Sequence, residues 1–383
     1  MDQSRRILIG LLFCGLVFLA AQCTTESSVH NSTNSTPSMQ KADGLIYYSK
    51  RGNANNFENR GFGGLYLTNL VTREETSLTS DSAVAQVDGF SWSPILRKLI
   101  FSGQGKNGVD GRYLYTLDLS HNVTQLSKGD SYDNGGRWSP DGHKIAFWSI
   151  RPDNYMFYLM DIDGTNVRPV FEQARELLLG NEFVWAPDNK KLAVSTIRDD
   201  SLPINLDAPS NNIVVVELEP NETSSPLPGN RIRTDFSWSY DSNKLVYLSN
   251  PTKVNDFVRV STAMCVFDIR SKKETVLAEF KVIGTPVWSP IEDIIAFSAA
   301  KSEETDELNI YLINGDGTGL KQLTDSGAYR VASWSPDGSK LAVEIIGAQL
   351  TDHEIGVIDI KIGTLERITH NDVFDAFPIW VEL

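Results

Sequence analysis

Seven polar residues stand three to five positions before regularly spaced tryptophans. A fold that brings these repeated positions together, at the mouth of a central channel, would let the seven side chains do chemistry. They are Asp88, Asn134, Asn181, Glu182, Asp235, Arg330 and Asp375. Four of them are carboxylates and Arg330 is the only cation, so a convergent arrangement would attract a metal ion or a basic group of a partner. Asp88, Asp235 and Asp375 could form a weak calcium site. In the simpler interpretation, these side chains accept hydrogen bonds from neighbouring backbone amides and bind no ligand.

Other motifs give weaker support for catalysis or cofactor binding. The segment Gly103–Gly108 matches a dinucleotide glycine pattern, but no helix is expected beside it to bind phosphate. The segment Asp161–Gly164 resembles the start of a calcium loop and lacks the later glutamate ligand. The chain contains no nucleophile elbow or zinc-protease motif, and its five histidines are scattered. We therefore predict no catalytic residue and no cofactor other than calcium at the site named above.

The tryptophans define an internal repeat. Seven of them recur at steps of 46, 47, 53, 50, 46 and 46 residues: Trp92, Trp138, Trp185, Trp238, Trp288, Trp334 and Trp380. In one well-preserved copy, Trp138 is followed by the turn Ser139-Pro140-Asp141-Gly142, then Lys144, then the apolar run Ile145-Ala146-Phe147. An indole that recurs at one repeat position is expected to pack between repeats rather than to stack on a ligand.

Each repeat predicts four β-strands and no helix. After the apolar run, an alternating segment such as Phe157–Ile162 indicates a half-buried strand, and Asp163-Gly164 indicates a hairpin turn before a short fourth strand. One such sheet cannot cover its own faces and edges, whereas a ring of sheets can. The predicted fold class is therefore all-β: a seven-bladed β-propeller of four-stranded antiparallel blades over residues 44–383.

The two ends of this region predict how the ring closes. The run at Leu45 corresponds to the second strand of a repeat, and Trp380 lies in a first strand. We expect the C-terminal strand to pair with the N-terminal one and to complete the first blade. This pairing would tie the termini together.

The pattern Trp-Ser-Pro-Asp-Gly-x-Lys, as it stands in Trp138 to Lys144, resembles the repeats of the TolB-like (WD-repeat-like) β-propeller family. The resemblance covers Gly44 to Leu383 and implies a propeller fold. It implies little about function, because the repeated residues are those that build blades. Peptidases of the prolyl oligopeptidase type join a propeller to a hydrolase domain, for which we expect no room in this chain.

The first 43 residues predict export. Arg5 and Arg6 precede the apolar run Ile7–Ala21, so residues 1–22 are typical of an export signal. Cys23 follows at the position where bacterial lipoproteins receive lipid, and residues 23–43 are a Ser/Thr-rich segment predicted to be a flexible tether. Alternatives are a soluble protein cleaved near Ala21 and a retained membrane anchor. All three place the folded part in the periplasm or on the outer surface.

Charge and cysteine content restrict the partners. The chain has 35 Lys plus Arg against 49 Asp plus Glu, and its net charge of −14 disfavours nucleic acid. Beyond the export signal only Cys23 and Cys265 remain, too few for a disulfide framework, and Cys265 is expected to be a small buried residue. We expect a monomer that contacts a membrane only through a lipid anchor or a retained signal.

Long insertions indicate where a partner binds. They lie at Ser49–Gly61, Ser195–Asn211 and Ser249–Thr262, always between the second and third strand of a repeat, so they should crowd one rim of the ring. The function we favour is a non-catalytic exported scaffold that presents this face to a protein, peptide or glycan. Two alternatives stay open: a channel-mouth enzyme, either a glycan lyase or a hydrolase, and a propeller subunit of a separately encoded hydrolase.

Overall fold

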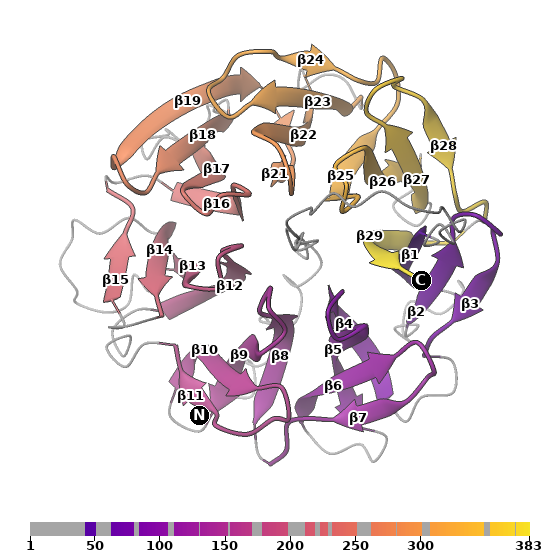
Figure 1. Ribbon diagram of the computed structural model, residues 1–383, viewed down its shortest axis with the longest axis vertical. Helices are drawn as coiled ribbons and strands as arrows, with labels where there is room; N and C mark the ends of the chain where they lie inside the picture. The colour runs from indigo at the N-terminus through magenta and orange to yellow at the C-terminus, as the bar shows by residue number, and fades with distance from the viewer. Residues whose placement is uncertain are drawn as a thin grey trace, which may run out of the picture.

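The computed structural model describes fifteen segments of the chain. They are residues 43–50, 63–79, 84–105, 111–129, 131–151, 154–170, 178–197, 211–218, 223–228, 232–250, 262–280, 282–300, 307–347, 353–371 and 373–383. These segments form β-strands joined by turns, without a helix among them. The strands build antiparallel sheets that radiate from a central axis, so the fold is an all-β propeller with four-stranded blades (Figure 1).

Four sheets contain four strands, named A to D from the axis outward. The sheet that contains both ends of the ring has the order β29 (Asp375–Glu382), β1 (Asp43–Ser49), β2 (Gly64–Asn69), β3 (Glu75–Ser77). Two further sheets have the orders β12 (Leu178–Trp185), β13 (Lys191–Ile197), β14 (Asn211–Glu217), β15 (Thr223–Pro226) and β16 (Ile232–Trp238), β17 (Lys244–Asn250), β18 (Thr262–Asp268), β19 (Lys273–Phe280). The fourth has the order β25 (Tyr329–Trp334), β26 (Lys340–Ile346), β27 (His353–Asp359), β28 (Leu365–Arg367). Antiparallel pairing and the short turns between strands A and B and between strands C and D match the hairpins that the sequence predicts.

A fifth sheet has a divided inner strand. Both β20 (Val282–Ile283) and β21 (Val287–Trp288) pair with β22 (Ile294–Ala300), which is followed by β23 (Asn309–Asn314) and β24 (Lys321–Gln322). Pro286 stands in the gap, and a proline lacks the amide hydrogen that the ladder requires.

The remaining strands form one eight-stranded sheet. One half contains β4 (Val84–Ser93), β5 (Lys98–Gly105), β6 (Arg112–Asp118) and β7 (Val123–Gln125); the other contains β8 (Tyr132–Trp138), β9 (Lys144–Arg151), β10 (Asn154–Asp161) and β11 (Arg168–Pro169). Each half is antiparallel within itself. The halves are joined by a single parallel pair, Arg112 with Tyr132.

The chain ends meet in one sheet. Strand β29 pairs with β1 in antiparallel register, with Gly44 opposite Val381 and Leu45 opposite Trp380. Leu45 and Trp380 are both buried. The predicted pairing of the C-terminal strand with the N-terminal one is therefore present.

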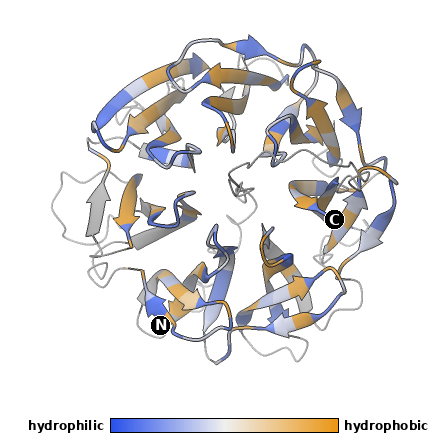
Figure 2. Cartoon of the chain, viewed as in Figure 1, coloured by the Kyte–Doolittle hydropathy of each residue, from blue (hydrophilic) through white to orange (hydrophobic). Residues whose placement is uncertain are grey.

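Burial decreases from the axis outward. The second and third strands, such as β26 and β27, are buried along most of their length, whereas the outer strands β24 and β28 expose Lys321, Gln322, Glu366 and Arg367. Figure 2 shows the same trend, with hydrophilic residues on outer strands. Because neighbouring sheets cover both faces of the inner strands, those strands have continuous apolar runs instead of strict alternation.

The repeated tryptophans join neighbouring sheets. All seven are buried, with at most 8% of their surface exposed. Four of the indole nitrogens donate to the backbone carbonyl that precedes the tryptophan of the neighbouring sheet: Trp185 to Arg137 (3.3 Å), Trp238 to Val184 (3.2 Å), Trp334 to Val287 (2.9 Å) and Trp380 to Ser333 (3.3 Å). The ring therefore fills the interface between sheets, and its nitrogen fixes the spacing between them.

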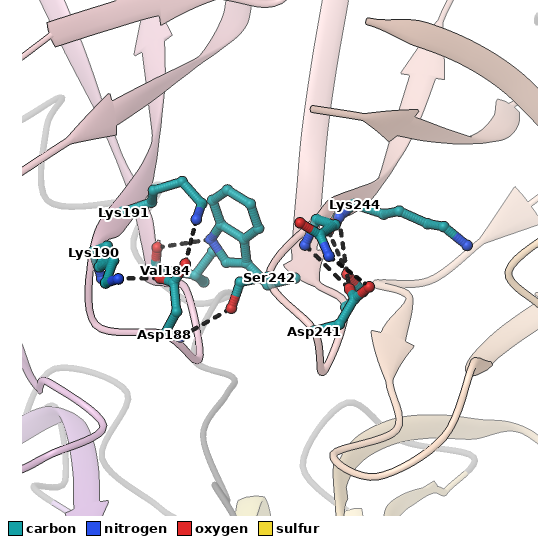
Figure 3. A network of polar contacts seen from close by, with 10 residues as sticks. Val184, Asp188, Lys190, Lys191, Asp241, Ser242 and Lys244 are labelled. Carbon is teal, nitrogen blue, oxygen red and sulfur yellow. Dashed lines mark hydrogen bonds and ion pairs between the residues drawn. The ribbon is translucent and has the colours of Figure 1, made fainter. Parts of the chain in front are cut away.

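The turn between strands A and B also bonds to its neighbour. The Asp188 amide donates a hydrogen bond of 2.9 Å to Ser242 Oγ, which belongs to the corresponding turn of the neighbouring sheet (Figure 3). Likewise, the Asp141 amide donates to Asn189 Oδ1 at 2.8 Å. Ser242 and Asn189 have φ of 61° and 62°, a conformation that normally favours glycine. Here a polar side chain replaces glycine and gains a bond to the adjacent turn.

The repeated lysine has three kinds of partner. Lys191 pairs with Asp188 of its own turn and lies 5.9 Å from the Trp238 ring of the next sheet. Lys244 instead pairs with Asp293 of the next sheet at 3.1 Å, and Lys144 pairs with Asp161 at the end of strand C. These partly exposed pairs contribute about 1 kcal/mol or less each.

The indole hydrogen bond predicts a difference between two conservative variants. Trp238→Phe and Trp138→Phe both shrink a buried ring, but only Trp238 donates to a carbonyl, since the Trp138 nitrogen has no partner within the described segments. We expect Trp238→Phe to lower the free energy of unfolding by about 1 kcal/mol more than Trp138→Phe. Urea denaturation of both variants measures this difference, and equal losses would contradict it.

Candidate functional site

The inner strands change register just before their tryptophans. Shifts interrupt the pairing of six of them: β4, β8, β12, β16, β25 and β29. Three positions before the tryptophan, four residues adopt positive φ: Gly89 (54°), Gly135 (64°), Asp235 (53°) and Phe377 (59°). A β-bulge of this kind removes amides from the ladder and directs them toward the neighbouring sheet. The predicted site residues therefore lie on or beside irregular backbone.

Side chains of the preceding sheet accept hydrogen bonds from these amides. The Gly135 amide donates to Ser102 Oγ at 2.9 Å, and the Val331 amide donates to Ser298 Oγ at 2.8 Å. The third example joins the Phe377 amide to Glu344 Oε1 at 3.0 Å. Ser102, Ser298 and Glu344 each stand ten residues after the tryptophan of their own repeat. One strand-B position thus caps the bulge of the next sheet.

Glu182 and Asp235 form the closest association among the predicted residues. Glu182, from β12, accepts hydrogen bonds from the amides of Asp235 (3.2 Å) and Phe236 (3.1 Å) on β16. Thr285 then donates its hydroxyl hydrogen to Asp235 Oδ1 at 2.8 Å. Glu182 is buried and Asp235 is half-buried. A chain of polar contacts therefore crosses three neighbouring sheets.

Burial dominates the electrostatics of Glu182. Burial has the largest effect on the pKa of Glu182, and the charge of the nearby Asp235 carboxylate has the next; together they raise this pKa to about 8. Two amide hydrogen bonds and the charge of Arg137 act in the opposite direction. Burial also lowers the pKa of Arg137 to about 10, while Glu182 opposes that change. The Arg137 guanidinium lies 5.2 Å from the Phe183 ring centroid. Arg330 is therefore not the only cation near the predicted carboxylates, as the sequence analysis assumed.

Glu344 organises a second cluster that the sequence analysis did not identify. Its carboxylate is fully buried and accepts from Arg330 Nη1 at 2.8 Å as well as from the Phe377 amide. His353 Nδ1 lies 4.0 Å from Glu344 Oε2, and the His353 ring packs on Phe374 at 4.6 Å. Burial raises the pKa of Glu344, and the charge of Arg330 opposes that increase.

The other predicted residues have separate surroundings. Asp375 is fully buried and accepts from Asn371 Nδ2 at 2.8 Å, and Asn134 Oδ1 accepts from the Gly135 amide at 2.6 Å. The backbone of Asp88 lies on β4 and that of Asn181 on β12, but their side chains are outside the description. The contacts thus unite Glu182 with Asp235, whereas Arg330 and Asp375 have partners of their own.

Metal ligands and membrane helices can be assessed only within the described segments. There, no group of three or more His, Cys, Asp or Glu side chains could hold a metal ion. Because the Asp88 side chain is not described, calcium binding by Asp88, Asp235 and Asp375 stays a prediction. Cys265 is a buried residue on β18. No helix in the same segments is long and apolar enough to span a membrane.

The sequence contains one signal that could have identified Glu344. It interrupts the apolar run Leu341–Ile346 at the capping position where two other repeats have Ser102 and Ser298. A charged residue in such a run implies a specific partner, because burying an unpaired charge is costly. Arg137 stands directly before its tryptophan, where the other repeats have serine, valine or isoleucine, so its charge is a second signal of this kind.

Comparison with known proteins supports the fold and leaves activity open. No protein-family model matches the chain. A stretch of 121 residues, 27% of this chain, is 28% identical to dipeptidyl-peptidase 5 of Porphyromonas gingivalis and covers 17% of that protein. The match thus spans about one sixth of that curated relative.

Two solved structures illustrate the structural likeness. A prolyl endopeptidase aligns with a TM-score of 0.58 and 14% identity over 87% of this chain and 49% of the other. TolB from Acinetobacter baumannii aligns with a TM-score of 0.49 and 17% identity over 75% of this chain and 65% of the other. TolB proteins are thus among the structural neighbours of this propeller, and identities this low establish fold alone.

The raised pKa of Glu182 predicts a pH-dependent stability. Between its ordinary pKa of 4.5 and about 8, the folded protein binds a proton that the unfolded chain releases. The free energy of unfolding should therefore fall as the pH rises through this window, by up to about 1.4 kcal/mol per pH unit, and level off above it. Glu182→Gln should remove this contribution.

Thermal melting from pH 5 to 9 measures the effect as the difference between the parent protein and Glu182→Gln. Glu74→Gln, at an exposed glutamate, is the matched control and should follow the parent. Parallel profiles for all three proteins would show that Glu182 has no raised pKa.

Proposed function

We propose that this protein is a non-catalytic binding scaffold of the cell envelope, exported by residues 1–22 and held to a membrane through Cys23. One observation carries the proposal: two buried carboxyl groups near the axis, Glu182 on inner strand β12 and Glu344 on β26, are occupied in joining neighbouring sheets. Glu182 accepts two amides of the next sheet, and Glu344 accepts an amide of β29 together with Arg330. Groups used in this way support a structural role for the ring centre and favour binding at the rim.

The channel-mouth enzyme has less support from this geometry. Such an enzyme would need Asp235 and Asp375 to reach one small ligand. Asp235 lies on β16 and bonds to Thr285, whereas Asp375 lies on β29 and bonds to Asn371. The two strands belong to different, well-separated sheets of the ring (Figure 1).

We propose seven blades for the ring. The four four-stranded sheets and the five-stranded sheet account for five. The two halves of the eight-stranded sheet supply two more, because they share only the Arg112–Tyr132 pair and each has its own tryptophan strand. Under this count, β29 is strand A of the blade that β1 begins.

The binding face would be the end of the ring where strands B and C are connected. The three long insertions, Ser49–Gly61, Ser195–Asn211 and Ser249–Thr262, lie mostly outside the described residues. The strands that flank them, such as β17 and β18, are paired in register from Lys244 with Asp268 to Ser249 with Ala263. A rigid frame of this kind would present the three connections together at one rim.

Loop replacement tests the scaffold. Each insertion is replaced in turn by a two-residue Asn-Gly hairpin connection, and the control substitutes serine for the exposed Arg270 and Lys272 in a turn at the opposite end. The immobilised proteins are probed with a glycan array, a peptide array and envelope extract. We expect at least one ligand to lose about tenfold or more in affinity with a loop variant and to be unaffected by the control. Binding that survives all three replacements would contradict the proposal.

A second candidate is a propeller subunit that serves a separately encoded hydrolase. The likeness to dipeptidyl-peptidase 5 and to a prolyl endopeptidase favours it, since the aligned part covers about half or less of each. This function predicts co-purification with a hydrolase whose activity changes when the propeller is removed. Dipeptide-coumarin release by material captured on the tagged protein measures it, and capture without peptidase activity would exclude a peptidase partner.

A further inference from the structure

One end of the ring combines two features that the proposed function does not use. We call this end the tight-turn face; it contains the turns that join strands A to B and C to D. The chain enters the ring here, because Asp43 begins β1 opposite Glu382 at the far end of β29. The carbonyl of Asp43 accepts a hydrogen bond at 2.9 Å from the amide of Leu70, which lies in a C–D turn. Burial raises the pKa of the Asp43 carboxyl group; among the charges of a neighbouring A–B turn, Lys340 opposes this increase and Asp337 adds to it.

The first feature is therefore the attachment point of the N-terminal region. Residues 1–42 contain the apolar run Ile7–Ala21 and Cys23, and they join the ring at the tight-turn face. The twenty residues from Thr24 to Asp43 would reach roughly 25 Å as a flexible chain. A lipid anchor at Cys23 would hold this face within that distance of the bilayer.

The second feature is a set of exposed apolar side chains in the turns of this face; the loops at the opposite end lie mostly outside the described segments, so this set implies no difference between the two ends. Eleven large apolar residues are exposed in the described segments, and eight of them stand in A–B or C–D turns: Val71, Ile95, Ile162, Val167, Tyr240, Ile291, Leu320 and Ile362. The most exposed are Val71 at 73% and Ile362 at 69%. Turns normally consist of small and polar residues, so apolar tips concentrated there need an explanation.

We propose that the tight-turn face rests on the lipid bilayer, with the apolar turn tips inserted between the lipid headgroups. The proposal rests on the proposed anchor at Cys23 and adds the orientation of the ring. The eight side chains belong to several sheets around the ring but to one end of it. A flat surface can meet all of them at once, whereas a folded partner or a peptide would cover only a neighbouring few.

The energetics suit a weak second contact. A single acyl chain gives only marginal, reversible membrane attachment, and stable attachment requires a second signal. The tether would supply a high effective concentration of bilayer beside the face, so several partly inserted side chains suffice without a large continuous patch. The opposite end, with the B–C connections, would then point away from the membrane toward a partner.

Hydroxyl-radical footprinting of the full-length protein on phosphatidylcholine vesicles tests the orientation. The matched reference is Ile150, which is exposed at 38% on β9 at the opposite end of the ring. In solution the greater exposure of Ile362 should make it oxidise faster than Ile150. On vesicles we expect the order to reverse, with oxidation of Val71, Leu320 and Ile362 reduced at least about fivefold, because interfacial insertion to about 5–10 Å removes side chains from water.

The anchor is assessed separately by the intact mass of the mature N-terminus. If Cys23 carries no lipid, the proposed anchor fails, and the footprint is repeated after a lipid maleimide is coupled to Cys23 of a Cys14→Ser variant, with Cys265 protected by its burial. Protection of the turn tips in either preparation supports the orientation. Tips that stay as accessible as in solution, or protection of Ile150 instead, would overturn it. A tightly bound protein that shields the tips before vesicles are added would also overturn it.

A variant pair provides an independent measurement. Val71→Ser, Leu320→Ser and Ile362→Ser remove three apolar tips together, and Tyr132→Ser, Ile150→Ser and Val276→Ser remove the three exposed apolar residues outside the turns. We expect only the first triple variant to abolish the footprint difference between vesicle-bound and free protein. If the second triple variant has the same effect, the contact is not specific to the tight-turn face.

Discussion

The whole architecture depends on contact between neighbouring sheets. A blade with apolar residues on both faces of its inner strands cannot be stable in water, so each sheet needs one neighbour on either side. The tryptophan at the end of strand A meets this requirement twice, because its ring is buried in the interface and, in four cases, its nitrogen bonds to the adjacent backbone. The A–B turns add a second line of hydrogen bonds through Ser242 and Asn189. Spacing and rotation between sheets follow from these few repeated contacts.

The same requirement explains the chemistry at the ring centre. Inner strands converge toward the axis and are bulged before their tryptophans, so backbone amides leave the ladder in a region where they must find acceptors. Serine suffices at Ser102 and Ser298, while Glu182 and Glu344 bring an ionisable carboxyl group into the interface. Burial then raises their pKa values, and Arg137 and Arg330 lie near enough to oppose that increase. Perturbed carboxylates here are a consequence of closing the ring, although perturbed pKa values elsewhere often mark catalysis.

Repetition decided how much the sequence could predict. Position-specific repeats such as Trp138 to Lys144 identify strands, turns and the class of fold, because the same local chemistry occurs in each unit. The pairing of β29 with β1 was predictable from the incomplete repeats at the two ends. The division of β20 from β21 appears in one repeat only, and β29 is continuous although Pro378 stands at the repeat position of Pro286, so periodicity gives no indication of the division.

Residues that depart from the repeat were harder to place. Glu182 and Asp235 were two of the seven residues singled out before the tryptophans, but the sequence could not show that the link between them runs from a carboxyl group to amides of the next strand. Arg330 was assigned to a shared site, whereas it pairs with Glu344, fourteen residues away on the adjacent strand. Such pairings depend on side-chain direction and on the bulge geometry, neither of which a single sequence specifies.

The position of β1 between β29 and β2 has a mechanical consequence. Tension between a membrane and a ligand held at the far rim would enter the protein at Asp43 and run along the axis of β1. That strand is paired on both edges, with β2 from Gly44 to Ser49 and with β29 from Asp43 to Ser49. Force along a strand loads its lateral hydrogen bonds simultaneously in shear instead of breaking them one after another. Force applied at Asp43 would therefore be opposed by two ladders of hydrogen bonds at once.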